Sequence, residues 1–145
     1  MSKGTSLLEL LVVLALTAIV AGIGALSHQA MRPALDLRSA ARQVVTDLRA
    51  ARMRAVAENT SRRVVFPSGA TGYQPQRKIG NAYVDDGVAV SLPRGILISD
   101  CTATGNGISF KPRGNAATFG TVSIRNSNGD ERSIIVDIAG QVRVQ

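Results

Sequence analysis

The sequence is poor in the side chains that carry most enzyme chemistry. Its 145 residues include one cysteine, Cys101, one histidine, His28, and no tryptophan. A single cysteine excludes an intramolecular disulfide, and no Cys/His cluster has the spacing of a metal site. No glycine-rich loop lies between a predicted strand and helix to hold phosphate. We therefore predict no catalytic residue, no cofactor and no metal, and we expect that the chain is not an enzyme.

Aromatic residues are also scarce, with three Phe and two Tyr. The apolar fraction of 45% is concentrated in one uncharged block, Leu10–Leu26. The rest of the chain must build its core mainly from Val, Ile, Leu and Ala. The length suits one modest domain with an appendage.

The apolar block has the length of a membrane segment. As a helix, its 17 residues cover about 26 Å, close to a bilayer core. Extension back to Thr5 encloses Glu9, and a carboxylate there costs about 2.5–3.5 kcal/mol unless it has a partner or a function. Lys3 favours a cytoplasmic amino terminus. A cleaved secretory signal ending at Ala25-Leu26-Ser27 and a plain single-pass anchor are the alternatives, but neither explains Glu9.

The residues around this acid resemble a known signal. Lys3-Gly4, then Thr5-Ser-Leu-Leu-Glu9 and a Leu/Val/Ala run, are similar to the class III signal of type IV prepilins and pseudopilins. The resemblance implies that a prepilin peptidase cuts after Gly4 and that Thr5 becomes N-methylated. It also implies that Glu9 pairs with the amino-terminal ammonium of a neighbouring subunit. Thr5 departs from the family pattern, in which Phe is usual.

An amphipathic helix is predicted after the apolar block. Pro33 is expected to kink or restart the helix, and Asn59-Thr60-Ser61 ends the pattern. The apolar residues between them recur every three or four positions, which indicates one buried face. They are Leu37, Ala41, Val44, Leu48, Ala51 and Ala55.

From Arg62 onward the period changes to two and turn residues become frequent, which predicts an antiparallel sheet. Asn126-Ser-Asn-Gly-Asp130 indicates a hairpin turn, and the polar stretch from Tyr73 to Asp86 is predicted to be a surface loop. The predicted strands are Arg63–Phe66, Val88–Leu92, Ile96–Ile98, Thr121–Arg125, Ser133–Asp137 and Gln141–Val144.

The carboxyl half narrows the resemblance. Four segments are similar to the carboxyl-terminal sequence of the GspH/FimT family of minor pseudopilins. They are Phe110–Asn115, Gly120–Ile124, Arg132–Val136 and Gly140–Val144. This implies an α+β, pilin-like fold, with a long, partly transmembrane helix packed on a small antiparallel β-sheet domain. The expected parts are a leader (1–4), a hydrophobic transmembrane and assembly helix (5–32), an amphipathic helix (33–60) and a β-rich domain (61–145).

The same resemblance implies partners and a location. The chain is expected to be a minor subunit at or near the tip of a type IV pilus or a type II secretion pseudopilus, and the sequence does not separate these systems. Its partners would be other pilins or pseudopilins, the prepilin peptidase, an inner-membrane assembly platform and inner-membrane lipid. It would cross the bacterial inner membrane once, with a periplasmic carboxyl-terminal domain, before it enters the filament.

Charge leaves a DNA-binding alternative open. The net charge is +7, and eight arginines lie between Arg32 and Arg63 against three acids. Such a segment attracts nucleic acid or anionic lipid, or is simply a solvated helix face. Some FimT-type minor pilins bind DNA for uptake through Gly-Arg-x-Arg, but here Gln141 follows Gly140. The candidate DNA contacts are Arg143, Arg132, Arg125 and Arg113, and an exposed strand residue is the alternative reading of Arg143.

Overall fold

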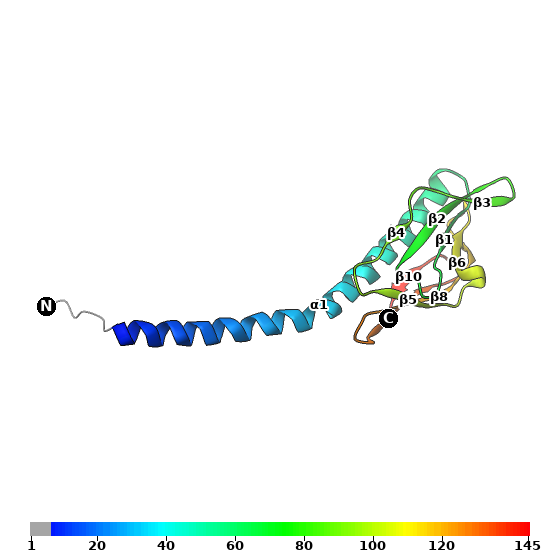
Figure 1. The fold of residues 1–145 in the computed structure, drawn as a ribbon. Coiled ribbons are helices and arrows are strands. Elements are labelled where there is room, and N and C mark those ends of the chain that lie inside the picture. The colour runs from blue at the N-terminus through cyan, green and yellow to red at the C-terminus, as the bar shows by residue number, and fades with distance from the viewer. Residues whose placement is uncertain (1–6) are drawn as a thin grey trace. The chain divides into compact units, whose positions relative to one another are not determined.

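The computed structural model describes the backbone of residues 7–145 and the side chains of residues 7–20 and 32–145 (Figure 1). The chain divides into two compact units, Met1–Arg32 and Pro33–Gln145. One helix, α1 (Leu7–Ala57), contributes to both units. The helix assignment continues through Pro33, because the lost amide donor removes only one hydrogen bond of the ladder.

In the first unit, the described side chains from Leu7 to Val20 are exposed. The hydroxyl of Thr17 donates to the carbonyls of Val13 (3.0 Å) and Leu14 (2.9 Å), so this polar group is satisfied within the helix. Among the described residues, no helix combines the length and the hydropathy that a bilayer crossing requires.

In the second unit, α1 buries the face predicted from the sequence. Leu37, Ala41, Val44, Leu48 and Ala55 are buried, and Ala51 is packed against them. The helix ends where the pattern ended, because Asn59 takes a left-handed conformation (φ 49°). The amide of Thr60 then donates to the carbonyl of Ala55 (3.1 Å), which is the geometry of a Schellman cap.

Ten short strands form two antiparallel sheets in the second unit (Figure 1). The first sheet has the order β3-β2-β1-β6-β7, with β4 also paired to β2, and the second has the order β10-β9-β8-β5. The strands are β1 (Arg62–Val65), β2 (Gly72–Ile79), β3 (Ala82–Asp85), β4 (Val90–Ser91), β5 (Leu97–Cys101), β6 (Gly107–Phe110), β7 (Ala116–Thr118), β8 (Gly120–Arg125), β9 (Glu131–Val136) and β10 (Val142–Val144). A 3-10 turn, η1 (Thr104–Asn106), precedes β6.

The six predicted strands are present, but the loop predicted from Tyr73 to Asp86 is wrong. This stretch forms β2 and β3, which pair with each other, and β2 also pairs with β1. Ile79 and Val84 are exposed in this stretch, and several of its polar side chains interact across the strands. Arg63 Nη2 donates to Gln76 Oε1 (2.7 Å), and Gln76 Nε2 donates to Asp85 Oδ1 (2.9 Å). The Arg63 guanidinium also lies 4.3 Å from the centre of the Tyr83 ring.

The predicted hairpin turn between β8 and β9 is confirmed. The Asn126 amide donates to the carbonyl of Asp130 (3.0 Å), and Asn126 Oδ1 accepts from the amides of Asn128 (3.0 Å) and Asp130 (2.9 Å). Gly129 takes φ 89°, which a residue with a side chain rarely adopts. The turn brings the strands of the carboxyl-terminal sheet into register.

The core lies between the buried face of α1 and the strands. Three of the five aromatic residues, Phe66, Tyr73 and Phe110, are buried there, and aliphatic residues from β1, β5, β6, β8, β9 and β10 fill the rest. The rings of Phe66 and Tyr73 are 5.1 Å apart and tilted, a favoured geometry for an aromatic pair. The fold is therefore α+β, with an amino-terminal helix packed on antiparallel sheets.

Candidate functional site

The amino-terminal part of α1 exposes an unusual amount of apolar surface. Its large aliphatic side chains are 49–83% exposed. These residues are Leu7, Leu8, Leu10, Leu11, Val12, Val13, Leu14, Leu16, Ile19 and Val20. A helix that is apolar all round needs lipid or protein around it. This surface is therefore the first candidate functional region of the chain.

Glu9 is the only charged residue between Leu7 and Val20, and its side chain is exposed on the apolar helix. The carboxylate would be costly to bury without a partner. Gly4 and Thr5, the residues predicted to flank a cleavage site, lie outside the described residues.

A row of arginines follows one flank of α1 beside the buried face. Arg38, Arg42, Arg49 and Arg52 are separated by four, seven and three residues, spacings that return to the same side of a helix. We did not assign these residues a contact from the sequence. Their spacing indicates that they share one side of the helix, but the sequence does not show which groups they contact, because those groups come from distant segments.

Two of these arginines hold the carboxyl-terminal segment. Arg49 Nη2 donates to the carbonyl of Val142 (3.2 Å). Arg52 donates through Nε to the carbonyl of Gly114 (2.7 Å) and through Nη2 to that of Ala139 (3.4 Å). These charge-assisted bonds join α1 to β10 and to the loops that precede β7 and β10, all far away in the sequence. Arg49 and Arg52 therefore stabilise the packing of α1 against the β domain.

Gly140 is required by the same packing. It takes φ 77°, and a Cβ built on it would lie 2.4 Å from the carbonyl oxygen of Gly114 and 3.1 Å from Arg52 Nε. The first residue of Gly140-Gln-Val-Arg143 is thus explained by a close backbone approach and a left-handed conformation.

We expect Gly140→Ala to lower the free energy of unfolding by about 2–4 kcal/mol, because it adds a backbone clash to left-handed strain. Gly69→Ala is the matched control: Gly69 has φ 79° but nothing within 4 Å of a Cβ. Its loss should be limited to about 1–2 kcal/mol, the left-handed cost alone. Urea unfolding followed by circular dichroism compares the two. Equal losses would contradict the close-approach argument.

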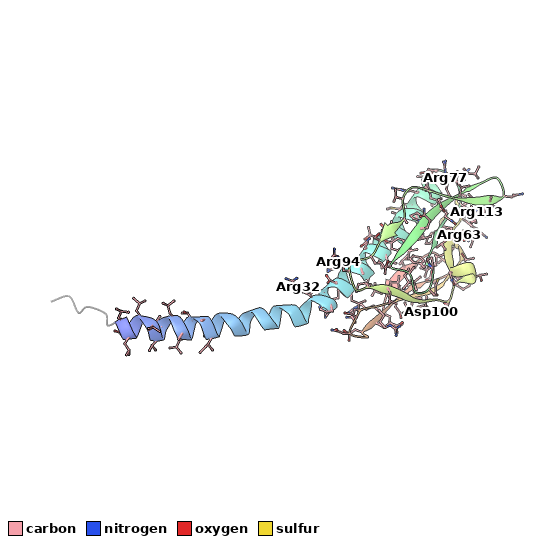
Figure 2. The ribbon with its side chains drawn as sticks, in the orientation of Figure 1. Arg32, Arg63, Arg77, Arg94, Asp100 and Arg113 are labelled. Atoms are coloured by element: carbon pink, nitrogen blue, oxygen red, sulfur yellow. The ribbon has the colours of Figure 1, made fainter. Side chains whose placement is uncertain are left out.

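The four candidate DNA contacts lie in three different places. Arg113 is in the loop between β6 and β7, at the end of the domain where α1 finishes (Figure 2). Arg125 and Arg143 alternate with buried residues of β8 and β10 and face outward. Arg132 alternates the other way, on the side of β9 that carries Ile134 and Val136, and it lines a depression with Arg38 and Arg42 of α1.

Acids reduce the positive charge of the outward-facing pair. Arg143 Nη2 lies 3.5 Å from Asp137 Oδ2. Arg125 stands opposite Glu131 in the register of β8 and β9. The backbone amide of Gln141 donates to Asp137 Oδ1 (2.8 Å), so the Asp137 carboxylate closes this turn. The predicted arginines therefore do not form one continuous cationic surface.

An ion-pair network around the buried Arg62 lies at the end of the domain where α1 finishes. Arg62 is 8% exposed at its side chain and donates to Glu58 after the helix and to Asp86 after β3. Burial by itself lowers the pKa of Arg62, but the hydrogen bonds to Glu58 and Asp86 outweigh it and raise this pKa above its ordinary value. The guanidinium therefore remains charged and links three segments.

Two other titratable groups are unsuited to catalysis. Burial raises the pKa of the Cys101 thiol, which keeps it protonated and unreactive. Burial, and then the hydrogen bond that the Tyr73 hydroxyl donates to Asp47, raise the pKa of Tyr73 well above its usual range. Within the described residues, no three His, Cys, Asp or Glu side chains are grouped to hold a metal ion.

Comparison with solved structures identifies the same fold in filament proteins. The minor pseudopilin EpsH from the type 2 secretion system of Vibrio cholerae matches with a TM-score of 0.64 and 10% identity, over 76% of this chain and 96% of that chain. The type IV minor pilin FimU of Pseudomonas aeruginosa matches with a TM-score of 0.58 and 17% identity, over 75% of this chain and 92% of that one. No curated protein sequence is significantly similar to the chain.

The solved structures share too little sequence identity with the chain to show its family, but a family model does match its sequence. The model described as "Type II transport protein GspH" matches residues 40–140, which is more than half of the chain. The match includes the arginine flank from Arg42 onward, most of both sheets and Gly140. The chain therefore belongs to the GspH family, whose fold it shares with minor pseudopilins and minor pilins.

Proposed function

We propose that the chain is a minor subunit of a type II secretion pseudopilus or a type IV pilus, held in the bacterial inner membrane before it assembles. The observation that carries this proposal is the apolar surface of α1 between Leu7 and Val20. Lipid covers this surface before assembly, and the helices of neighbouring subunits cover it afterwards. The family membership and the fold of EpsH and FimU support this role.

The membrane step follows from the sequence around the helix. Leu10–Leu26 is uncharged, and Lys3 before it keeps the amino terminus in the cytoplasm. The domain from Pro33 onward would then lie in the periplasm. Prepilin peptidase removes residues 1–4, and Thr5 becomes the methylated first residue. An inner-membrane assembly platform then transfers the subunit into the filament, at or near its tip.

Glu9 sets the position of the subunit along the filament in this proposal. Its carboxylate pairs with the amino-terminal ammonium of a neighbouring subunit. The pair offsets the cost of enclosing both charges in an apolar helical bundle. The role is structural, and the proposal assigns the chain no catalytic activity.

We expect the full chain, produced in cells that assemble the filament, to be present in the sheared filament fraction together with the other subunits. Site-specific photocrosslinking from Leu14, which is exposed on α1, should capture other subunits. The control is Phe119, an exposed residue of the β domain outside this helix, which should give fewer such products. A chain absent from filaments and crosslinked only to lipid would contradict the proposal.

DNA binding is the alternative function, and the arrangement of the arginines favours it less than filament assembly. The carboxyl-terminal Gly140-Gln-Val-Arg143 lacks the first arginine of the FimT-type pattern. Its remaining arginine is beside Asp137. Arg125 faces the same side of the second sheet, but Arg113 lies in the loop between β6 and β7 and Arg132 faces the flank of α1. A duplex that follows a row of cations gains affinity from each phosphate contact, and this domain does not align these four residues in such a row.

A further inference from the structure

Three arginines surround one surface depression of the second unit. Arg38 and Arg42 reach it from successive turns of α1, and Arg132 reaches it from the start of β9. Ala41 and Val144 complete the lining, and the volume is about 230 Å³. Arg132 occupies the inward side of β9, in line with the buried Ile134 and Val136, so its cation is directed toward the helix flank rather than away from it.

The described part of the chain forms no ion pair with this cluster, although Asp130 and Glu131 line a neighbouring depression with Arg38 and Arg132. None of the three guanidinium groups has a carboxylate oxygen within 4.0 Å among the described residues. The two acids that precede Arg132 in the sequence, Asp130 and Glu131, accept hydrogen bonds from other side chains. Asp130 Oδ2 accepts from Asn126 Nδ2 (2.9 Å), and Glu131 Oε1 accepts from Ser99 Oγ (2.9 Å). Like charges one helical turn apart repel each other, so the cluster favours binding of an anion.

The surroundings restrict the size of that anion. The next arginines along the flank, Arg49 and Arg52, donate to main-chain carbonyls. Arg125 and Arg143 lie on the outward side of the second sheet. The arginines on this flank that have no main-chain carbonyl partner therefore lie at one depression. A compact oxyanion fits this arrangement better than the extended backbone of a duplex, which requires a series of contacts.

We propose that Arg38, Arg42 and Arg132 bind one phosphate group, carried by an anionic lipid headgroup or free in solution. Guanidinium groups donate paired hydrogen bonds to phosphate oxygens, and three of them from two elements enclose a tetrahedral anion on several sides. The lipid source rests on the proposed membrane function. Arg38 follows the end of the apolar block, Leu26, by only twelve residues, and basic residues close to a membrane segment attract anionic headgroups.

The test uses the full chain in a non-ionic detergent, with its arginine side-chain Nε–H groups observed by nitrogen-15 NMR. Inorganic phosphate and a short-chain phosphatidylglycerol should each shift the signals of Arg38, Arg42 and Arg132 in a saturable manner. Phosphatidylcholine, whose choline cancels the phosphate charge, should not. The double variant Arg38→Gln/Arg132→Gln should bind both anionic probes about tenfold more weakly or worse.

Arg125→Gln/Arg143→Gln is the matched control, because it removes the same charge from the opposite side of the sheet. It should keep the affinity of the unaltered chain. Equal weakening in both double variants, or no saturable shift with phosphate, would overturn the site. Binding of a duplex oligonucleotide through the three residues without phosphate binding would also overturn it, in favour of nucleic acid.

The same measurements distinguish a free phosphate from a lipid headgroup as the ligand, and they test the anion site independently of the proposed assembly role. Binding of phosphate without phosphatidylglycerol supports the site and assigns it to the free anion. Because this measurement requires no filament, its failure leaves the proposed assembly role intact, and loss of filament incorporation leaves the anion site intact.

Discussion

Glu9→Ala should leave the chain in the membrane with a processed amino terminus but lower its incorporation into filaments at least about tenfold. The reason is electrostatic. Loss of the carboxylate leaves the ammonium of a neighbouring subunit without a counter-charge inside an apolar bundle, and an uncompensated buried charge costs several kcal/mol. Quantitative immunoblotting of sheared filaments against the membrane fraction measures this ratio.

Two further variants identify the property that matters at this position. Glu9→Gln keeps the size and the hydrogen-bonding oxygen but removes the charge, so it should assemble as poorly as Glu9→Ala. Thr17→Ala, in the same exposed helix, removes a hydroxyl that bonds only to its own turn, and it should assemble normally. Normal incorporation of Glu9→Ala would refute the role of the carboxylate in axial register.

Gly4→Ala should abolish processing, so that the chain accumulates with residues 1–4 attached. In the proposed cleavage, Gly4 precedes the scissile bond, and alanine adds a methyl group where glycine has no side chain. Mass spectrometry of the membrane-extracted protein distinguishes the two forms by the mass of residues 1–4 and by the methyl group on Thr5.

Ser2→Ala is the control for the leader, since it changes a residue away from the proposed cut and should be processed like the original chain. A mature amino terminus at Thr5 in the Gly4→Ala variant would show that this glycine does not define the cleavage position. An unprocessed Gly4→Ala chain should also be absent from filaments, because its amino terminus would not be available to pair with Glu9.

Much of the fold could be predicted from periodicity. Leu37, Val44 and Leu48 recur with the helical period, and this spacing alone places them on one buried face. Asn126-Ser-Asn-Gly-Asp130 contains the residues that a hairpin turn demands, and the structure forms that turn. Such local patterns succeed because each depends on backbone geometry over a few neighbouring residues.

The first sheet shows where periodicity failed. The stretch from Tyr73 to Asp86 lacks a repeated apolar face, so we predicted a loop. Its pairing depends instead on partners from other strands, such as Gln76 between Arg63 and Asp85. The polar strands β2 and β3 bury few side chains, and their strand character comes from main-chain hydrogen bonds to neighbours that the sequence does not specify.

The contacts of the arginines in the candidate site were likewise not predictable from the sequence. Nothing in their sequence context distinguishes Arg52, which donates to Gly114 and Ala139, from Arg38, which has no carboxylate partner among the described residues. Similarly, Gly140 matched a family pattern, but its close approach to Gly114 was visible only in the fold.

An apolar amino-terminal helix with one acid in it, an amphipathic continuation and an antiparallel β domain are all predictable from the sequence alone. These features follow from composition, period and turn chemistry, which are local properties. Tertiary contacts determine which arginines of α1 donate to main-chain carbonyls and which line a surface depression. The separation of Arg49 and Arg52 from Arg38, Arg42 and Arg132 depends on carbonyls and strands that approach α1 from distant parts of the chain.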